Sequence, residues 1–298
     1  MAKGPATVVL AAVALAGCLG AAPAPQDLGA TAPAPVVAVP ADHGLRLDAQ
    51  DCTEGGGYST YNKADLEGLL PAPWVLADVS ADLGDPLVLG LAEGPNMGGG
   101  IAGIYHATWQ CATHTMDGED GGAILGGFVG LRVEPPPFDS GGAARHYFVT
   151  VLSSGDHHLL EHLEQNGFAH VGDAQGVVEW LGPVFHQVLD DAMHGRYEVH
   201  FVAHEAGPKD DGVTRLWMLF EGDDADYHPR SLDLLDTGGV HYYAEQGNGP
   251  FTHTNTDDHA PLPAAAGNVA GLAFEGFART VTVGPAPPVA LDQTFEHL

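Results

Sequence analysis

Short apolar stretches recur along the chain between clusters of Gly, Pro and Asp. They are rich in β-branched and aromatic residues and have the length of strands rather than helices. We predict strands at residues 74–79, 87–92, 101–110, 123–133, 147–152, 197–204, 213–220, 240–244 and 269–283. The glycine runs at 55–57 and 98–100 are typical of turns. The pattern predicts a mainly β protein with few short helices, a β-rich α+β fold built as a single antiparallel barrel or sandwich.

One helix is clearly predicted, over residues 156–166. Asp156 can cap its first turn, and Gly167 can end it. Leu159, Leu160 and Leu163 then share the face that turns inward.

A second, shorter helix is predicted between Asn62 and Pro71. Asn62 is a suitable N-cap residue, and the chain before a proline leaves the helical conformation. Residues 184–193 fit a helix or a strand equally well.

The N-terminal segment has the anatomy of an export signal. Lys3 precedes an apolar run from Ala6 to Ala16, which would rise only about 16 Å as a helix. A membrane span needs about 20 apolar residues. The quartet that ends at Cys18 (Leu-Ala-Gly-Cys) resembles the lipobox of prokaryotic lipoproteins. We therefore expect residues 1–17 to be a lipoprotein signal peptide and Cys18 to carry the lipid that anchors the protein to a membrane; an ordinary signal peptide is the alternative.

The segment after Cys18 is rich in Ala and Pro and poor in large apolar residues. Such a composition favours an extended chain over a packed core, so residues 18–48 are predicted to be a flexible tether. Residues 49–285 have the length of one β-rich domain and contain no Pro-rich linker. Residues 286–298 form a C-terminal tail in this division.

The chain is strongly acidic, with 39 acidic and 10 basic residues and a net charge of −29. Nucleic acid and anionic headgroups are bound through Lys and Arg, so neither is an expected partner. A solvated acidic surface of the kind found in halophilic proteins explains this composition, and calcium binding is the alternative. The segment 117–121 (Asp-Gly-Glu-Asp-Gly) lacks the alternating ligands of an EF-hand.

Two cysteines remain beyond the predicted anchor, Cys52 and Cys111. An even pair in an exported chain predicts one disulfide.

The stretch from the strand at 149–152 through the helix at 156–166 to Gly167-Phe168-Ala169-His170-Val171 resembles the acetoacetate decarboxylase-like family. In that family a strand and a short helix lead to a Gly-aromatic-Pro-Lys-Lys turn, which presents the Schiff-base lysine inside a cone-shaped barrel. The resemblance covers about 25 residues and implies that fold and an internal cavity.

The family's catalytic motif is not kept. Gly167 and Phe168 match the Gly-aromatic pair, but His170 and Val171 stand where the family has its lysines. Schiff-base chemistry needs a primary amine, and Lys63 and Lys209 are the lysines outside the predicted signal. The family's decarboxylation route is therefore not expected here.

The chain contains 17 histidines, which raises the question of metal binding. On the strand at 197–204, alternation places Glu198, His200 and His204 on one side. Residues four apart on a strand are separated by about 13 Å, so both histidines cannot hold one ion without partners from a neighbouring strand. A polar solvent face explains the same pattern.

His158 and His162 are one turn apart on the predicted helix and could bind a metal ion together. The Glu that follows the first histidine of the His-Glu-x-x-His motif is replaced by Leu159. Exposed helix histidines are the alternative interpretation.

No coherent catalytic set emerges from the sequence. We expect a surface-tethered binding or scaffold protein without decarboxylase activity, whose barrel holds a small hydrophobic ligand near Phe168, His170, Glu198 and His200. No cofactor is required by the sequence. The alternatives are a metal-binding lipoprotein that uses His158, His162, His200 or His204, and a divergent decarboxylase-like enzyme with altered chemistry at His170.

Overall fold

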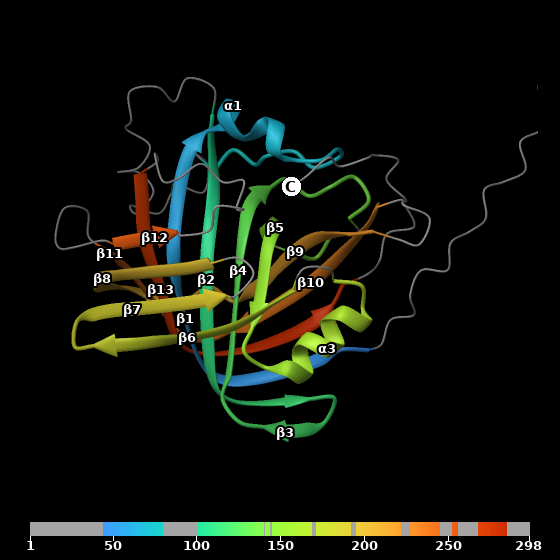
Figure 1. Cartoon of the computed structure of the whole chain (residues 1–298). Helices are drawn as coiled ribbons and strands as arrows, with labels where there is room; N and C mark the ends of the chain where they lie inside the picture. The colour runs from blue at the N-terminus through green and yellow to red at the C-terminus, as the bar shows by residue number, and fades with distance from the viewer. Residues whose placement is uncertain are drawn as a thin grey trace, which may run out of the picture. The chain divides into compact units, whose positions relative to one another are not determined.

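The computed structural model describes residues 44–79, 100–139, 141–143, 145–168, 171–191, 195–221, 227–244, 252–255 and 268–284. Cys18, His170, the segment 1–17, the strand predicted at 87–92 and the tail 286–298 lie outside these residues. The described chain is mainly strand, as predicted, and its strands belong to one sheet (Figure 1).

The strands are β1 (Arg46–Asn62), β2 (Ile101–Met116), β3 (Glu119–Gly121), β4 (Ile124–Val133), β5 (Arg145–Ser154), β6 (Val171–Leu181), β7 (Val184–Asp191), β8 (Gly195–Pro208), β9 (Gly212–Glu221), β10 (Tyr227–Thr237), β11 (Val240–Ala244), β12 (Thr252–Asn255) and β13 (Asn268–Val283). The helices are α1 (Lys63–Leu66), the 3₁₀ turn η1 (Glu67–Leu69) and α3 (His157–Gln165). None of the helices in the described ranges is long and apolar enough to cross a membrane.

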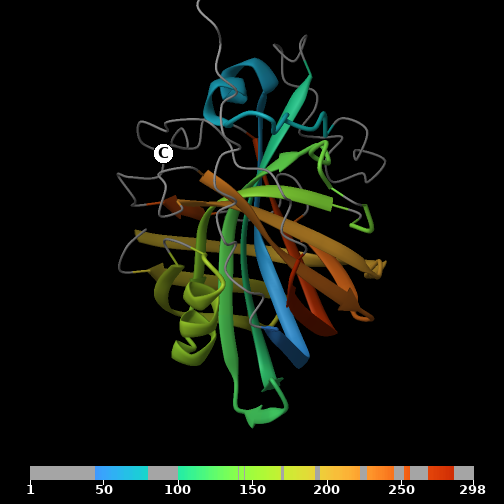
Figure 2. The same ribbon diagram turned by 90° about the vertical axis from the view of Figure 1, so that its right-hand side faces the viewer.

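The sheet closes on itself in two ways. The order β1-β2-β4-β5-β9-β10-β13 returns to β1 through the β5–β9 and β1–β13 pairings. The order β1-β2-β4-β5-β6-β7-β8-β11-β13 also returns to β1. The strands β1, β2, β4, β5 and β13 are therefore shared, and Figure 2 shows the orange strands crossing the upright blue and green ones.

The sheet is mixed rather than wholly antiparallel, which corrects the predicted strand arrangement. β5 pairs in parallel with β9 along Arg145–Phe148 and with β6 along Leu152–Ser154. Parallel neighbours need a long connection, and α3 provides it between β5 and β6. One edge of β5 therefore pairs with β9 of one ring near its start and with β6 of the other ring near its end.

The two faces of the shared strands are buried in different clusters. Tyr58 and Tyr105 belong to a cluster that includes Leu216 and Leu234 of β9 and β10. On the other face, Phe185 of β7 packs with Val199, Phe201 and Ala273. β9 and β10 thus cover one face, and β7 and β8 cover the other.

The glycines at 55–57 lie in the middle of β1, so the predicted turn there is wrong. A Cβ atom on Gly55 would overlap the ring of Phe185, and one on Gly56 would overlap the backbone carbonyl of His106. These positions are glycine because β7 and β2 approach the backbone of β1 closely.

The predicted helix at 156–166 is confirmed as α3. The Asp156 carboxylate accepts a hydrogen bond from the backbone N–H of Leu159 at 3.0 Å, as an N-cap does. Gly167 ends the helix with φ +79°. Leu159, Leu160 and Leu163 are buried in the cluster of Tyr105.

Three other local predictions have different outcomes. Residues 74–79 form a single bridge, Leu76 to Val133, instead of a strand; Pro71 and Pro73 beside them lack backbone donors. Residues 184–191 are strand β7. The short helix after Asn62 is present as α1 and η1, but the side chain of Asn62 makes no capping hydrogen bond.

Two features mark the start of the folded body. β1 begins at Arg46, inside the segment assigned to the tether, and the neighbouring Leu45 and Leu47 are buried. The predicted disulfide joins Cys52 of β1 to Cys111 of β2, which are paired across the sheet.

Candidate functional site

A cluster of charged residues lies buried on the face of the sheet that β9 and β10 cover. Arg279 of β13 is 2% exposed. Its Nη2 is 2.6 Å from Oε2 of Glu54 and 2.7 Å from Oδ2 of Asp236, and its Nε is 2.7 Å from Oδ1 of Asp236. The guanidinium therefore binds carboxylates from β1 and β10 at once.

Lys209 brings a second cation to this cluster. Its Nζ is 3.0 Å from Oδ2 of Asp236 and lies over the rings of Phe274 and Phe277. The four charged groups, Arg279, Lys209, Glu54 and Asp236, balance one another in number. We call these four residues the Arg279 cluster.

Aromatic side chains surround the Arg279 cluster. The guanidinium carbon is 5.3 Å from the ring centre of Trp109 and 5.0 Å from that of Phe277. The hydroxyl of Tyr105 donates to Oε1 of Glu54 at 2.9 Å. Ion pairs in such a low-dielectric setting are strong only when every donor is matched.

One donor of the cluster is not matched. Nη1 of Arg279 is buried and has no hydrogen-bond partner in the described part of the chain. A buried donor on a charged group that makes no hydrogen bond costs about 1–3 kcal/mol or more. This nitrogen is therefore available to an acceptor that is not one of the described side chains.

The surroundings fix the protonation states of the cluster. Burial works to lower the pKa of Arg279, but the ion pairs with Asp236 and Glu54 outweigh burial, so the pKa lies above its ordinary value. Burial works to raise the pKa of Asp236, and Arg279 and Lys209 bring it below its usual value. Burial, together with Glu54, raises the pKa of Tyr105 well above 10.0. The arginine and Asp236 are thus charged and the tyrosine is a neutral donor at neutral pH.

The predicted ligand-binding residues divide between two places. Phe168 is fully buried in the same apolar cluster as Tyr105, Trp109 and Phe277. Glu198 and His200 are partly exposed and lie on the face of β8 opposite Val199 and Phe201. The structure does not bring them to Phe168.

The predicted metal candidates on β8 are also spread apart. His200 pairs across the sheet with His186, whose Nδ1 is 3.0 Å from Glu179 and whose Nε2 is 3.5 Å from Glu198. His204 instead contacts the ring of Tyr243, with 6.0 Å between the ring centres. Across the described ranges, no group of three or more His, Cys, Asp or Glu side chains is assembled that could hold a metal ion.

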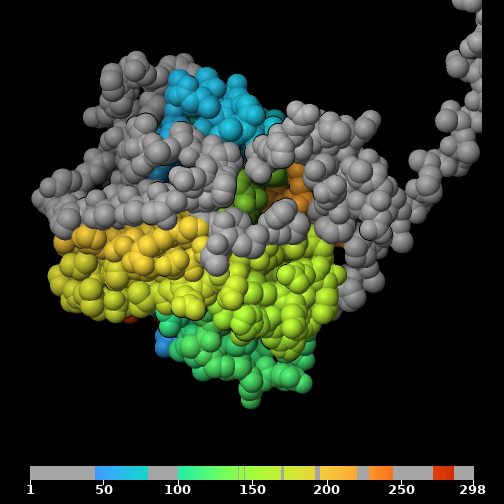
Figure 3. Space-filling model, in the orientation of Figure 1, coloured from blue at the N-terminus to red at the C-terminus, as the bar shows by residue number. Residues whose placement is uncertain are grey.

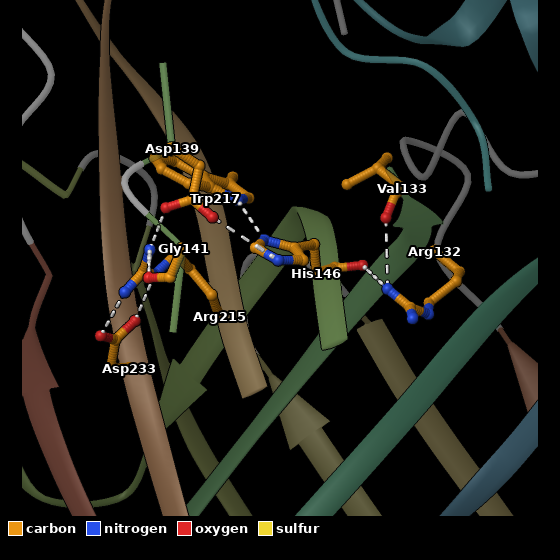
Figure 4. A network of polar contacts seen from close by, with 8 residues as sticks. All are labelled: Arg132, Val133, Asp139, Gly141, His146, Arg215, Trp217 and Asp233. Carbon is orange, nitrogen blue, oxygen red and sulfur yellow. Dashed lines mark hydrogen bonds and ion pairs between the residues drawn. The ribbon is translucent and has the colours of Figure 1, made fainter. Parts of the chain in front are cut away.

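A second buried polar network joins β5, β9 and β10 (Figure 4). Arg215 forms a two-bond ion pair with Asp233, at 2.6 and 2.8 Å, and also binds Asp139. Each terminal nitrogen of this guanidinium has a carboxylate partner, in contrast to Arg279. The network thus fastens the segment around Asp139 to the sheet.

His146 in this network is held neutral. The indole N–H of Trp217 donates to its Nδ1 at 3.2 Å, so the ring proton is on Nε2, which faces Asp139 at 3.6 Å. Burial lowers the pKa of His146, although Asp139 acts in the opposite direction. The lone pair of Nδ1 is thus used inside the protein by the indole of Trp217.

The comparisons with known proteins show a likeness of fold. No protein-family profile matches the sequence, and no curated protein matches it. A solved acetoacetate decarboxylase superposes with a TM-score of 0.50 at 9% identity, over 83% of this chain and 91% of that one. The acetoacetate decarboxylase of Legionella pneumophila gives 0.50 at 10% identity, over 82% and 88%. An acetoacetate decarboxylase-like enzyme from Sphingomonas wittichii gives 0.49 at 13% identity, over 84% and 93%.

The resemblance read from the helix and its flanking residues therefore agrees in fold with the two acetoacetate decarboxylases that superpose with a TM-score of 0.50. At 9–10% identity the likeness shows a shared fold and does not show that this protein catalyses the same reaction.

The Arg279 cluster is not among the sites that the sequence predicts. The signal was present in β13, where Phe277, Arg279 and Val281 alternate onto one face. An arginine in the middle of an apolar strand face indicates a buried ion pair or a ligand.

Proposed function

We propose that this protein binds a small, mostly apolar ligand at the Arg279 cluster and does so outside the cytosol, held to a membrane by lipid on Cys18. The observation that carries the proposal is Nη1 of Arg279, a buried donor with no partner in the described residues. A ligand oxygen beside it would remove the cost of that unmet hydrogen bond. The rings of Trp109 and Phe277, whose centres are 5.3 and 5.0 Å from the guanidinium carbon, supply apolar surroundings for the rest of the ligand.

The charges of the cluster narrow the class of ligand. Arg279 and Lys209 are already balanced by Glu54 and Asp236. A ligand carboxylate would add a buried negative charge without a counter-ion, which is costly. The preferred ligand therefore presents a neutral acceptor such as a carbonyl or hydroxyl oxygen.

Native mass spectrometry of the protein purified from its own source, without denaturant, tests the ligand. We expect one equivalent of a small molecule on the parent and none on Arg279→Lys, since lysine keeps the charge but lacks the second terminal nitrogen. Arg215→Lys is the matched control, because it weakens an equally buried arginine network whose terminal nitrogens are all bound by protein. A ligand-free parent, or equal loss from both variants, would refute the proposal.

The anchor has its own test. The export signal predicts a diacylglycerol on Cys18, and two acyl chains give stable membrane attachment. We expect the parent in the membrane fraction with a lipid-sized mass on its first residue, and Cys18→Ala released from the membrane. Native protein that still begins at Met1 and is free of lipid would contradict this part.

A divergent decarboxylase-like enzyme is the second candidate, favoured by the fold likeness. Against the family's route, the amine of Lys209 is engaged in an ion pair with Asp236 at 3.0 Å. We expect no turnover of a panel of 2- and 3-oxo acids. Turnover by the parent that His170→Ala abolishes would favour the enzyme instead.

A further inference from the structure

A pair of histidines on α3 faces the turn between β2 and β3. Nε2 of His158 and Nε2 of His162 are 3.1 Å apart, and their ring centres are 4.7 Å apart. His158 is exposed and His162 is partly buried. In Figure 3 the yellow-green surface of α3 adjoins the green surface of the β2–β3 hairpin on one face of the molecule.

A carboxylate from the turn approaches the same imidazoles. Oδ2 of Asp117 is 3.4 Å from Nε2 of His162. In a tetrahedral site with metal–ligand bonds of about 2.0 Å, neighbouring ligand atoms are about 3.3 Å apart. The two distances on His162, 3.1 Å to His158 and 3.4 Å to Asp117, bracket this spacing.

The backbone holds Asp117 in place for this role. Its Oδ1 accepts a hydrogen bond from the backbone N–H of Arg46 at 3.2 Å, and its own N–H donates to the carbonyl of Arg46 at 3.0 Å. Its φ of 52° places it in the left-handed region at the tip of the hairpin. The other carboxylate oxygen is thereby directed to the histidines, as outer partners direct metal ligands.

We propose that His158 and His162 form a two-imidazole clamp for a transition-metal dication such as Zn²⁺, with the carboxylate of Asp117 as the adjoining anionic ligand. Histidines four apart on one helix face suit zinc, copper and nickel ions. The described residues hold no preassembled set of three ligands. The imidazole pair is the preformed part of the clamp, and the carboxylate of Asp117 and water complete the coordination when the ion binds. The net charge of −29 also raises the local concentration of cations.

Such an ion would join α3 to the β2–β3 hairpin. A second contact between the same elements already exists, from Nε2 of His114 to Oδ2 of Asp156 at 3.7 Å. Binding would therefore stabilise the packing of α3 against the sheet. The site shares no residue with the Arg279 cluster.

The clamp is tested by titrating Zn²⁺ into the metal-free, folded protein and measuring the heat of binding by calorimetry. We expect one tight equivalent on the parent. We expect at least a tenfold weaker affinity in His158→Gln and in His162→Gln, and a smaller loss in Asp117→Asn. His157→Gln is the matched control: it removes an exposed histidine of the same helix turn and leaves the pair intact. Its affinity should equal that of the parent.

A second test uses Cu²⁺ bound to the unaltered protein. Because no residue is substituted, misfolding of a variant cannot explain the result. The electron paramagnetic resonance spectrum of the bound Cu²⁺ should show nitrogen ligands at one equivalent. The proposal is overturned if the parent binds no Zn²⁺ more tightly than His162→Gln does, if His157→Gln weakens binding as much as His158→Gln, or if the Cu²⁺ spectrum shows oxygen ligands alone.

Discussion

Glu54 and Arg279 form a buried ion pair between the first and last described strands, with 2.6 Å between Oε2 and Nη2 across 225 residues of sequence. The pair lies on the β1–β13 pairing that closes both rings of the sheet. The same ion pair therefore contributes both to the pairing of β1 with β13 and to the proposed ligand site.

Removing one partner of this pair should be strongly destabilising. Glu54→Ala leaves Arg279 with one carboxylate fewer in a buried setting, and we expect a loss of about 3–5 kcal/mol in the free energy of unfolding. Urea denaturation measures it. Asp48→Asn is the control, because Asp48 pairs with the exposed Arg46 and its loss should change far less. Equal losses in the free energy of unfolding would show that the buried pair contributes no more to stability than the exposed pair.

His146 should make stability depend on pH. Its pKa is lowered from 6.5 because burial disfavours the charged ring. The unfolded state thus binds the proton more readily, so the free energy of unfolding should fall as pH drops from about 7 through 6.5 and below, and recover at higher pH. In His146→Gln this fall should be shallower than in the parent, as measured by denaturation at several pH values. An identical pH dependence in parent and variant would contradict the neutral state assigned to His146.

The glycine run in β1 should not tolerate side chains. Gly56→Ala forces a Cβ atom onto the backbone carbonyl of His106, so the pairing of β1 with β2 must shift. We expect a loss of at least about 2 kcal/mol in thermal or urea unfolding. Gly68→Ala has no atom near the new Cβ and should be neutral or slightly stabilising. If Gly56→Ala unfolds like the parent, the close approach of the strands is not as described.

The disulfide should contribute substantially to stability. Cys52 and Cys111 close a loop of 59 residues, which corresponds to about 4 kcal/mol in the unfolded-chain entropy account. We expect the double variant Cys52→Ala, Cys111→Ala to lose about that much and to become insensitive to reducing agents. A reductant that leaves the stability of the parent unchanged would argue against the bond.

Local periodicity and capping explain why much of the fold could be predicted. The cap at Asp156, the leucines at 159, 160 and 163 and the stop at Gly167 are signals confined to one helix, and all are confirmed in α3. The predicted strand 101–110 likewise falls within β2, and the predicted strand 123–133 matches β4 to within one residue. Such signals depend on neighbours in sequence and are visible without a structure.

Features that depend on distant partners were not predictable in the same way. The glycines of β1 resemble a turn until Phe185 and His106 are seen beside them. Strand β10 was missed because Asp233 and Asp236 give it the composition of a solvated segment, although both carboxylates bind arginines from other strands. The 17 histidines suggest metal binding from the sequence. The buried charged cluster with the unmet donor is formed instead by Arg279, Glu54 and Asp236, which come from three separate strands.

A high-resolution crystal structure of the protein purified from its own source tests the central claim most directly. We predict a non-protein molecule with a neutral oxygen within about 3.2 Å of Nη1 of Arg279, a hydrogen-bond distance, and with its apolar part against Trp109 or Phe277. A protein acceptor or a lone water at that position would contradict the proposed ligand site.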